Sequence, residues 1–126
     1  MTDPIDAVMT TLDRYFDALN AQDSDGMRAQ FHFPHYRFST SGIQVYDTPE
    51  SYGIGIFLGR GDTQGWAYTR WDHRNVIQAG TDKVHLDVQF SRYRADDSVL
   101  GVYKSLWIVT RIDGRWGVQV RSSYAE

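Results

Sequence analysis

Side chains alternate between apolar and polar types through much of the second half of this 126-residue sequence, from Trp66 onward. A period of two is typical of β-strands, whose successive side chains point to opposite faces of a sheet. The pattern predicts four long strands at about 66–79, 84–94, 99–112 and 115–125. Strands joined by such short turns pair antiparallel, so we expect one antiparallel sheet to dominate the fold.

Three turns set the predicted registers of these strands. Asp113-Gly114, between Ile112 and Arg115, is a strong signal for a two-residue hairpin. The preceding turn is expected to centre on Asp96-Asp97, and the one before it on Thr81-Asp82. The turns at 113–114 and 96–97 give the pairs Trp107 with Val120, Ser105 with Ser122, Phe90 with Tyr103 and Leu86 with Trp107.

These registers sort the side chains of the last three strands onto two faces. One face is mostly apolar and aromatic, so we expect the rest of the chain to cover it; it comprises Val84, Leu86, Val88, Phe90, Tyr103, Ser105, Trp107, Val109, Trp116, Val118, Val120, Ser122 and Tyr124. The other face is mixed, with His85, Asp87, Gln89, Tyr93, Lys104, Leu106, Ile108, Thr110, Gln119 and Arg121. A mixed face is either a subunit interface or a solvated surface, and we expect a homodimer through it.

The first part of the chain follows a helical period instead. Apolar residues recur at steps of three and four from about 4 to 21, which predicts a helix capped by Asp3. A second helix is predicted from the Asp23-Ser24-Asp25 cluster to before Pro34, with Phe31 on its inner face. A strand pair at 35–39 and 43–46 and a weak third helix after 48–50 complete this part.

Length and composition limit the class of protein. The length suits a single domain over residues 1–126, and the net charge of -3 argues against a nucleic-acid partner. The absence of Cys excludes disulfides, thiolate nucleophiles and Cys-based metal sites. The sequence shows no signal-peptide pattern, long apolar run or Gly-rich phosphate loop, so we expect a cytoplasmic protein with no membrane contact and no cofactor.

Three segments carry a resemblance to a known family. RYFDALNAQDSDGMRAQF at 14–31 looks like a helical hairpin with an acidic-Gly turn, DHRNVIQAGTDKVHLDVQFSRYR at 72–94 like a central hairpin, and GRWGVQVRSSYA at 114–125 like a closing strand. In these segments the chain resembles an uncharacterised branch of the nuclear transport factor 2-like superfamily, which includes ketosteroid isomerases, scytalone dehydratase and SnoaL-like polyketide cyclases. The resemblance implies a cystatin-like α+β roll, in which a cone-shaped, strongly curved antiparallel sheet is covered by an N-terminal helical hairpin and a short third helix.

Tyr15 is the first candidate for chemistry. The residues around it are similar to the ketosteroid isomerase helix whose tyrosine helps form an oxyanion hole, so the resemblance implies that role. Those enzymes also use an aspartate base, where this sequence has Ser39, and a protonated aspartate near the position of Trp107 or Ile108. Because neither carboxylate is present, isomerisation by that mechanism is not expected. Tyr15 is equally well explained as a core residue.

His73 is the second candidate. A turn centred on Thr81-Asp82 directs His73 and Asn75 toward the covered face, where His73 is either a general base or a histidine hydrogen-bonded at the rim. A bulge in its strand would reverse this direction. Arg92 is expected on the same face, either to bind a ligand carboxylate or phenolate, or to pair with Asp72 or lie at an edge open to water.

A metal site is not predicted. His32 and His35 lie close together in the sequence, but no pair of ligand residues at helical spacing accompanies them.

The aromatic content, 14% of the residues, favours a small pocket-forming domain that binds an apolar or aromatic molecule, with or without proton-transfer chemistry of the SnoaL, isomerase or dehydratase kind. The catalytic candidates are His73 and Tyr15. The predicted pocket residues are Tyr36, Phe38, Asn75, Phe90, Arg92, Tyr103, Trp107 and Tyr124. The alternative is a non-catalytic, homodimeric association or protein-interaction domain.

Overall fold

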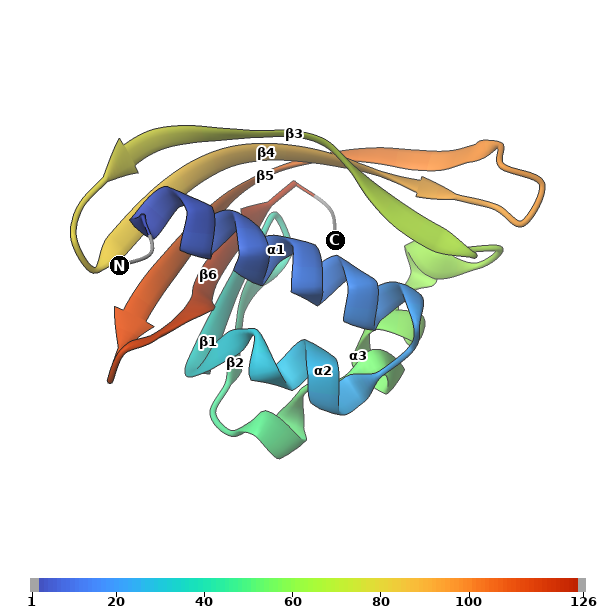
Figure 1. Cartoon of the computed structure of the whole chain (residues 1–126). Helices are drawn as coiled ribbons and strands as arrows, with labels where there is room; N and C mark the ends of the chain where they lie inside the picture. Colours follow the sequence, from blue (N-terminus) through green and yellow to red (C-terminus); the bar gives the residue numbers. More distant parts are fainter. Residues whose placement is uncertain (1–2, 125–126) are drawn as a thin grey trace.

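The computed structural model describes residues 3–124, in which one sheet curves around a long helix (Figure 1). The helices are α1 (Pro4–Asn20), α2 (Ser24–Ala29) and α3 (Ile54–Leu58), with 3-10 turns at Pro49–Ser51 and Gly61–Thr63. The strands are β1 (Phe31–Ser39), β2 (Gly42–Tyr46), β3 (Tyr68–Ala79), β4 (Lys83–Tyr93), β5 (Val99–Ile112) and β6 (Arg115–Ser123). The predicted α+β fold is confirmed; residue 125, at the end of the last predicted strand, lies outside the described residues.

The six strands form a single sheet in the order β2-β1-β6-β5-β4-β3. All neighbours are antiparallel except β1 and β6, which are parallel, so the expectation of a purely antiparallel sheet is wrong at this pair. A tight turn forces antiparallel pairing, but β1 enters from α2 and not from a turn shared with β6. The strand is therefore free to join the sheet in the same direction as β6.

The helix α1 follows the prediction closely. The Asp3 carboxylate accepts a hydrogen bond from the Ile5 backbone N–H at 2.8 Å and caps the first turn. The apolar stripe of the helix is buried against the sheet, from Val8 to Leu19. The second helix is shorter than predicted, because Phe31 leaves it to open β1 and pair with Val118.

The predicted registers are confirmed in part. Strands β4 and β5 pair as expected, with Phe90 opposite Tyr103. Strands β5 and β6 keep the expected register from the Asp113-Gly114 turn as far as Val118, where a bulge shifts it by one residue. Beyond the bulge the predicted pairs are wrong: Trp107 lies opposite Arg121 and not Val120, and Ser105 lies opposite Ser123 and not Ser122.

Strand β3 has two such irregularities against β4. Counted from the turn at 81–82, the first lies between Gln78, opposite His85, and Val76, opposite Leu86, and the second lies between His73, opposite Gln89, and Trp71, opposite Phe90. One extra residue in a strand turns all the following side chains to the opposite face. His73 therefore lies on the outer face of the sheet, whereas Trp71 faces the helix α1 and stacks on Phe16.

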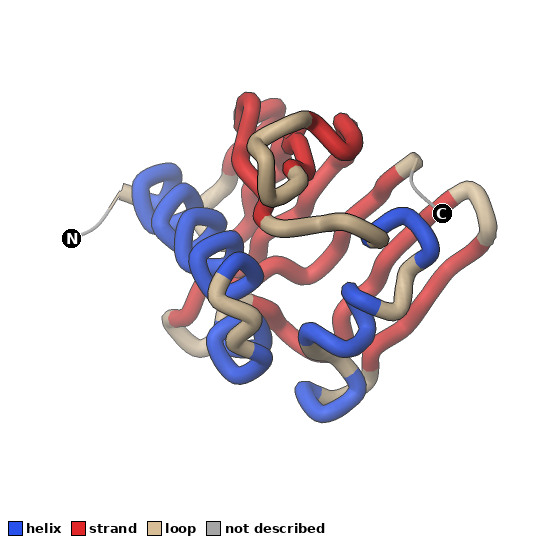
Figure 2. The backbone as a smooth tube through the Cα atoms, turned by 90° about the vertical axis from the view of Figure 1, so that its right-hand side faces the viewer, coloured by secondary structure: helices blue, strands red, loops and turns tan. Residues whose placement is uncertain are grey.

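The core fills the concave side of the sheet unevenly. One part, which we call the packed end, lies between the first half of α1 and the neighbouring ends of β4, β5 and β6; it comprises Val8, Leu12, Val84, Leu86, Val109 and Val118. Helices stand in front of the sheet in two groups, α1 with α2 and, apart from them, the short helical turns of residues 49–63 (Figure 2). Among the described residues, no helix is long and apolar enough to cross a membrane.

Candidate functional site

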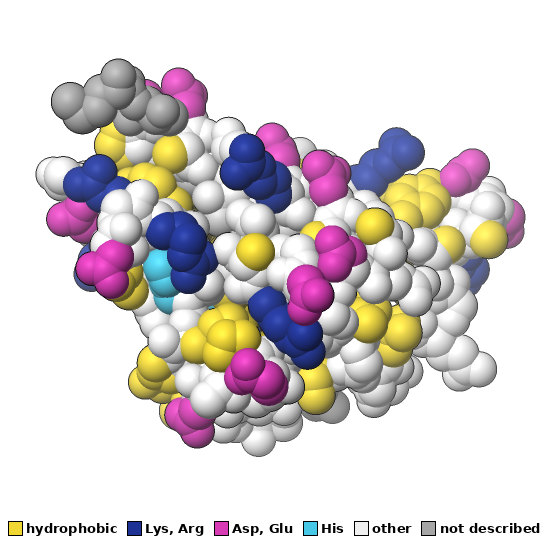
Figure 3. Space-filling view, turned by 60° about the horizontal axis from the view of Figure 1, so that its bottom comes forward, with side chains coloured by type: hydrophobic (Ala, Val, Ile, Leu, Met, Phe, Trp, Pro, Cys, Tyr) yellow, Lys and Arg dark blue, Asp and Glu magenta, His cyan; other side chains and the backbone are white. Residues whose placement is uncertain are grey.

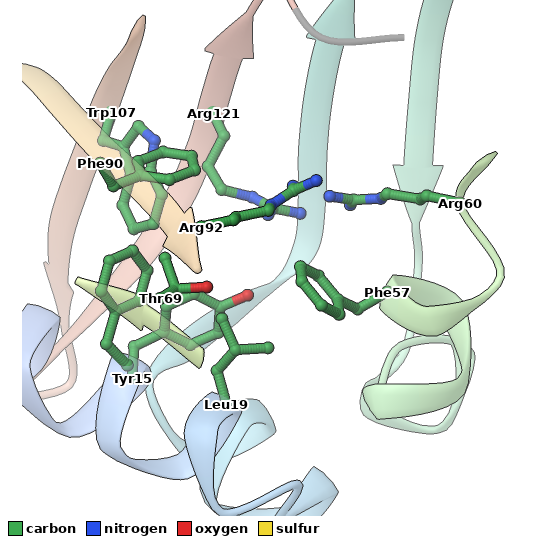
Figure 4. A pocket seen from close by; sticks show the side chains of 10 residues that line it. Tyr15, Leu19, Phe57, Arg60, Thr69, Phe90, Arg92, Trp107 and Arg121 are labelled. Carbon is green, nitrogen blue, oxygen red and sulfur yellow. The ribbon is translucent and has the colours of Figure 1, made fainter. Parts of the chain in front are cut away.

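A cavity lies on the concave side of the sheet, beside the second half of α1. Its walls are mostly aromatic, and three arginine side chains reach it from β4, β6 and the segment after α3 (Figure 4). It is lined by Tyr15, Phe16, Leu19, Phe57, Arg60, Thr69, Phe90, Arg92, Trp107 and Arg121. A second lobe adds Arg37, Ser105 and Ser123 and shares Arg60, Phe90, Arg92, Trp107 and Arg121. We call the two lobes together the inner cavity.

The inner cavity is small. Each lobe has a cavity volume of about 20 Å³. A volume of this size holds about one water molecule, whereas a cavity that binds benzene measures about 150 Å³. The inner cavity therefore has room for a group of a few atoms and not for a ring.

A wider groove opens beside the inner cavity, between β2 and α3. It has a volume of about 380 Å³ and is lined by Arg37, Gln44, Tyr46, Gly55, Ile56, Gly59 and Arg60. Arg60 borders the groove and both lobes of the inner cavity. The glycines on either side of Arg60 leave its backbone unusually free of steric restriction. This side chain thus stands between the inner cavity and the groove.

Aromatic rings cover the flat faces of the arginines. The Arg92 guanidinium carbon lies 4.2 Å from the centre of the Tyr103 ring and 4.9 Å from that of Phe57. The Arg121 guanidinium lies 5.1 Å from the Phe31 ring centre. Stacking of this kind stabilises a cation and leaves the N–H groups at its edge available.

Several of those N–H groups have no hydrogen-bond partner. They are Nε and Nη1 of Arg92, Nη2 of Arg121 and Nη2 of Arg60, all shielded from solvent. Arg92 Nη1 lies 3.1 Å from Asp62 Oδ1, but neither atom has a hydrogen-bond partner, so the contact is an ion pair without hydrogen-bond geometry. Buried donors are almost always paired in folded proteins, so unpaired donors at a cavity need an explanation.

Arg37 shows the effect of like charges on this site. Burial, together with the positive charges of Arg60 and Arg121, lowers the pKa of Arg37 to about 10. Arg37 stays protonated at neutral pH, so four guanidinium charges meet at the inner cavity. We call Arg37, Arg60, Arg92 and Arg121 the arginine cluster.

A buried polar chain holds Arg121 in place. Arg121 Nε donates to His35 Nε2 at 2.9 Å, and His35 Nδ1 lies 2.9 Å from the Val118 carbonyl oxygen, to which it donates. Burial and the charge of Arg121 lower the pKa of His35 well below its usual value. The imidazole is therefore neutral and acts as an acceptor for Arg121, not as an acid.

Tyr15 reaches the cavity wall from α1. Its hydroxyl lies 2.5 Å from the hydroxyl of Tyr52. Burial and the nearby Tyr52 raise the pKa of Tyr15 well above its usual value, so its hydroxyl stays protonated. The pair is a hydrogen-bonding element of the wall.

Four of the predicted site residues line the inner cavity: Tyr15, Phe90, Arg92 and Trp107. Tyr103 lies one layer behind, stacked on Phe90 with ring centres 5.7 Å apart. The bulges in β3 and β6 leave β4 and the middle of β5 in register, which is why these positions could be placed from the sequence. Their roles in binding stay predictions.

The other predicted site residues do not face the cavity. The bulge in β3 turns His73 and Asn75 outward, opposite Gln89 and Asp87, and both are exposed. Tyr36 and Phe38 alternate with the inward-facing Arg37 and so lie on the outer face of β1. Tyr124, after the end of β6, is 78% exposed. Their predicted places in the pocket are wrong.

Sequence reasoning missed most of the arginine cluster. Arg121 was expected on the outer face, and the bulge in β6 turns it inward. Arg60 lies in a loop, where no periodicity applies. The one available signal was composition, since the chain has 11 Arg and 2 Lys, and arginine is the residue that stacks on rings and binds carboxylates with two hydrogen bonds.

Metal ligands do not cluster in this part of the molecule. Within residues 3–124, no group of three His, Asp or Glu side chains is placed to hold an ion. His32 and His35 are both buried in β1, but each ring bonds to the backbone of its surroundings.

Solved structures share this fold at low sequence identity. A protein of unknown function with a cystatin-like fold from Nostoc punctiforme is 16% identical, with a TM-score of 0.75, covering 95% of this chain and 89% of its own. An NTF2-like protein of unknown function from Shewanella oneidensis is 13% identical, with a TM-score of 0.74 and 97% and 99% covered. A ketosteroid isomerase-like protein from Erwinia carotovora is 12% identical, with a TM-score of 0.71 and 99% and 98% covered. These likenesses show the fold alone.

The sequence comparisons point to one family. No curated protein matches the chain. Residues 6–126 match the family described as NTF2-like protein (DUF6841). The match spans almost the whole chain, and the curved sheet, the covering helices and the solved structures above agree with it. This chain therefore belongs to the NTF2-like protein family DUF6841.

Proposed function

We propose that this protein binds a small organic molecule in the inner cavity and the adjoining groove, which together we call the mouth of the curved sheet. A group of a few atoms enters the inner cavity, and an apolar or aromatic body lies in the groove between β2 and α3. The observation that carries the proposal is the position of Arg60, which borders the groove and both lobes of the inner cavity. Ligand sites commonly combine apolar walls with a few convergent polar groups, as these spaces do.

Acid–base catalysis is not part of the proposal. His73, the expected base, is exposed on the outer face, and His35 is engaged by Arg121 and the Val118 carbonyl. A general base must lie within hydrogen-bond reach of the proton that it removes. The residues that line the inner cavity and groove include no histidine and no carboxylate. Binding is therefore the function that the site supports best.

The test is a titration followed by two-dimensional NMR of the nitrogen-15-labelled protein. The probes are small benzene derivatives: phenol, benzamide and benzoate. We expect at least one of them to shift the Trp107 indole N–H and the backbone amides of residues 55–61 in a saturable way. If none of the three moves these signals at millimolar concentration, the proposal is wrong.

A pair of variants on α3 tests the groove itself. Gly55 lines the groove, and a Cβ there meets no atom within 4 Å, so Gly55→Leu is expected to narrow the groove. Leu58→Phe adds bulk at a position on the same helix that is 44% exposed and lines neither space. We expect Gly55→Leu to abolish the saturable shifts and Leu58→Phe to keep them. Equal binding by both variants would contradict a ligand body in the groove.

Association through the outer face of the sheet is the second candidate function. Paired residues on the outer side of β2, β1, β6 and β5 form two adjoining rows that are largely apolar: Ile43, Phe38, Ser122 and Leu106 in one row, and Val45, Tyr36, Val120 and Ile108 in the other. Phe38, Ile43, Val45 and Leu106 are exposed. Contiguous apolar surface of this kind is typical of interfaces, and a second copy of the chain is the proposed partner.

Light scattering after size-exclusion chromatography tests this association. We expect twice the mass of one chain at micromolar concentration for the wild type, and one chain mass for Leu106→Arg. Val99→Arg changes an exposed residue at the start of β5, outside the two rows, and is the matched control. A monomeric wild type would rule out the homodimer.

A further inference from the structure

We infer that the molecule bound at this site carries a carboxylate, which the edges of Arg60, Arg92 and Arg121 receive in the inner cavity. The inference rests on the proposed function, since it names the chemical class of the ligand bound there. It is carried by the unpaired N–H groups of these arginines and by the way in which their charges are buried.

The three guanidinium groups come from separate parts of the fold and meet at one place. Figure 4 shows Arg92 and Arg121 extending from the sheet and Arg60 from the opposite side, with their nitrogen atoms turned toward one another. Arg92 and Arg121 are at most 6% exposed. Burial and, after it, the positive charges of Arg60 and Arg121 make the charge of Arg37 costly, and together they lower its pKa to about 10. An anion among these groups would remove that cost.

The surroundings stabilise the charges but leave several of their donors unused, although Arg121 Nε donates to His35 Nε2. Ring faces stack on Arg92 and Arg121, while Nε and Nη1 of Arg92 and Nη2 of Arg121 stay unpaired. A structural arginine would be expected to bond to carbonyl or carboxylate oxygens, as Arg115 does with the carbonyl oxygens of Ala29 and Phe31. The unpaired donors of the cluster belong instead to residues that line the inner cavity.

Asp62 is an acidic side chain that lies close to one of these unpaired donors. Its Oδ1 lies 3.1 Å from Arg92 Nη1, yet neither atom has hydrogen-bond geometry, and the Asp62 side chain is 32% exposed. Asp62 lies in the 3-10 turn Gly61–Thr63, directly after Arg60. It therefore offsets part of the charge from the edge of the site and competes for Arg92 Nη1 without forming a hydrogen bond to it.

The outer surface does not share this excess of positive charge. The chain has a net charge of -3, and on the face in Figure 3 the basic and acidic side chains alternate. A gathering of arginines within an acidic chain concentrates positive potential in one cleft, which attracts anions.

The size of the inner cavity favours a carboxylate over a phosphate. Each lobe has room for about one water molecule, which suits the two oxygens of a planar carboxylate better than a tetrahedral group with four. The guanidinium edge also matches the carboxylate in geometry, with two parallel N–H donors for two oxygens. A carboxylate in the inner cavity leaves the rest of its molecule directed past Arg60 into the groove.

Isothermal titration calorimetry with four probes tests the inference. Benzoate and benzamide have the same ring and differ in charge, formate is a carboxylate without a body, and inorganic phosphate is the tetrahedral anion. We expect benzoate to bind at least about tenfold more tightly than benzamide, a difference of about 1.4 kcal/mol. Its affinity should fall as salt rises, and formate should bind more weakly than benzoate.

Two arginine variants locate the anion. Arg92→Met keeps most of the side-chain volume and removes the donors, and should lower benzoate affinity to that of benzamide. Arg111→Met is the matched control, because Arg111 pairs with Asp82 on the surface and lines neither lobe nor the groove. It should leave both affinities unchanged.

The outcomes separate the inference from the proposed function. Equal affinity for benzoate and benzamide, or full benzoate affinity in Arg92→Met, overturns the carboxylate inference and leaves binding in the groove standing. Formate binding as tightly as benzoate supports the carboxylate and removes the ligand body from the groove. Phosphate binding more tightly than formate overturns the choice of carboxylate. Absence of benzoate binding at millimolar concentration overturns the inference.

Discussion

The two ends of the space under the sheet are built from the same strands but filled in opposite ways. At the packed end, Leu12 and Leu86 are fully buried among other hydrocarbon side chains. At the mouth, Arg92 and Arg121 are almost as deeply buried, yet several of their donors have no partner. Burial of apolar groups stabilises a fold, whereas burial of hydrogen-bond donors without partners opposes it. The packed end therefore supports the fold, and the mouth is explained by what it binds.

The first prediction concerns a substitution that destabilises the packed end. Leu86→Ala should reduce the free energy of unfolding by about 2–5 kcal/mol, because it removes buried methyl groups and leaves a cavity. Leu58→Ala, at an exposed leucine of α3, should change it by less than about 0.5 kcal/mol. Urea unfolding measures both. Similar losses for the two variants would mean that the packed end contributes no special stability.

The second prediction concerns the buried histidines of β1. Burial is the main cause that lowers the pKa values of His32 and His35, so the unfolded chain binds more protons than the folded one below about pH 6.5. Stability should be complete above that pH and should fall as the pH drops from about 6.5 toward 5, by up to about 1.4 kcal/mol per pH unit for each histidine. Thermal unfolding across this range measures the slope. His35→Gln should reduce the slope, and a flat wild-type profile would contradict the account.

The third prediction concerns the affinity of the mouth for a carboxylate. Asp62→Asn removes a carboxylate that competes for Arg92 from 3.1 Å away, so benzoate should bind several-fold more tightly to this variant. The same calorimetric titration measures it. A weaker affinity would show instead that Asp62 positions Arg92 for its ligand.

The sequence was sufficient for the packed end and for part of the mouth. Unbroken alternation places Leu86, Phe90 and Arg92 on the inner face of β4, and these placements were predicted correctly. Single extra residues in β3 and β6 reverse His73 and Arg121, and a bulge of one residue leaves no signal in the hydrophobic pattern. The result is that a histidine expected inside lies outside, and an arginine expected outside lies at the centre of the site.

The second reason why the site could not be predicted in full is that part of it lies in a loop. Arg60 follows α3 in a glycine-rich segment without periodicity, so no pattern could direct its side chain toward the inner cavity. The overall fold could be recognised because long strands and an amphipathic helix repeat their signal many times. A binding site depends on single side chains, and each of them is decided by local geometry.

The free energy of unfolding of Arg92→Met, compared with the wild type in the absence of ligand, tests the central claim most directly. The claim is that the donors of Arg92 serve a bound anion and do not hold the fold together. Arg92→Met should be as stable as the wild type or more stable by up to about 2 kcal/mol, because it replaces a poorly paired buried charge with an apolar side chain of similar length. A loss of about 3 kcal/mol or more, the cost of breaking a structural buried ion pair, would contradict the claim and make Arg92 part of the scaffold.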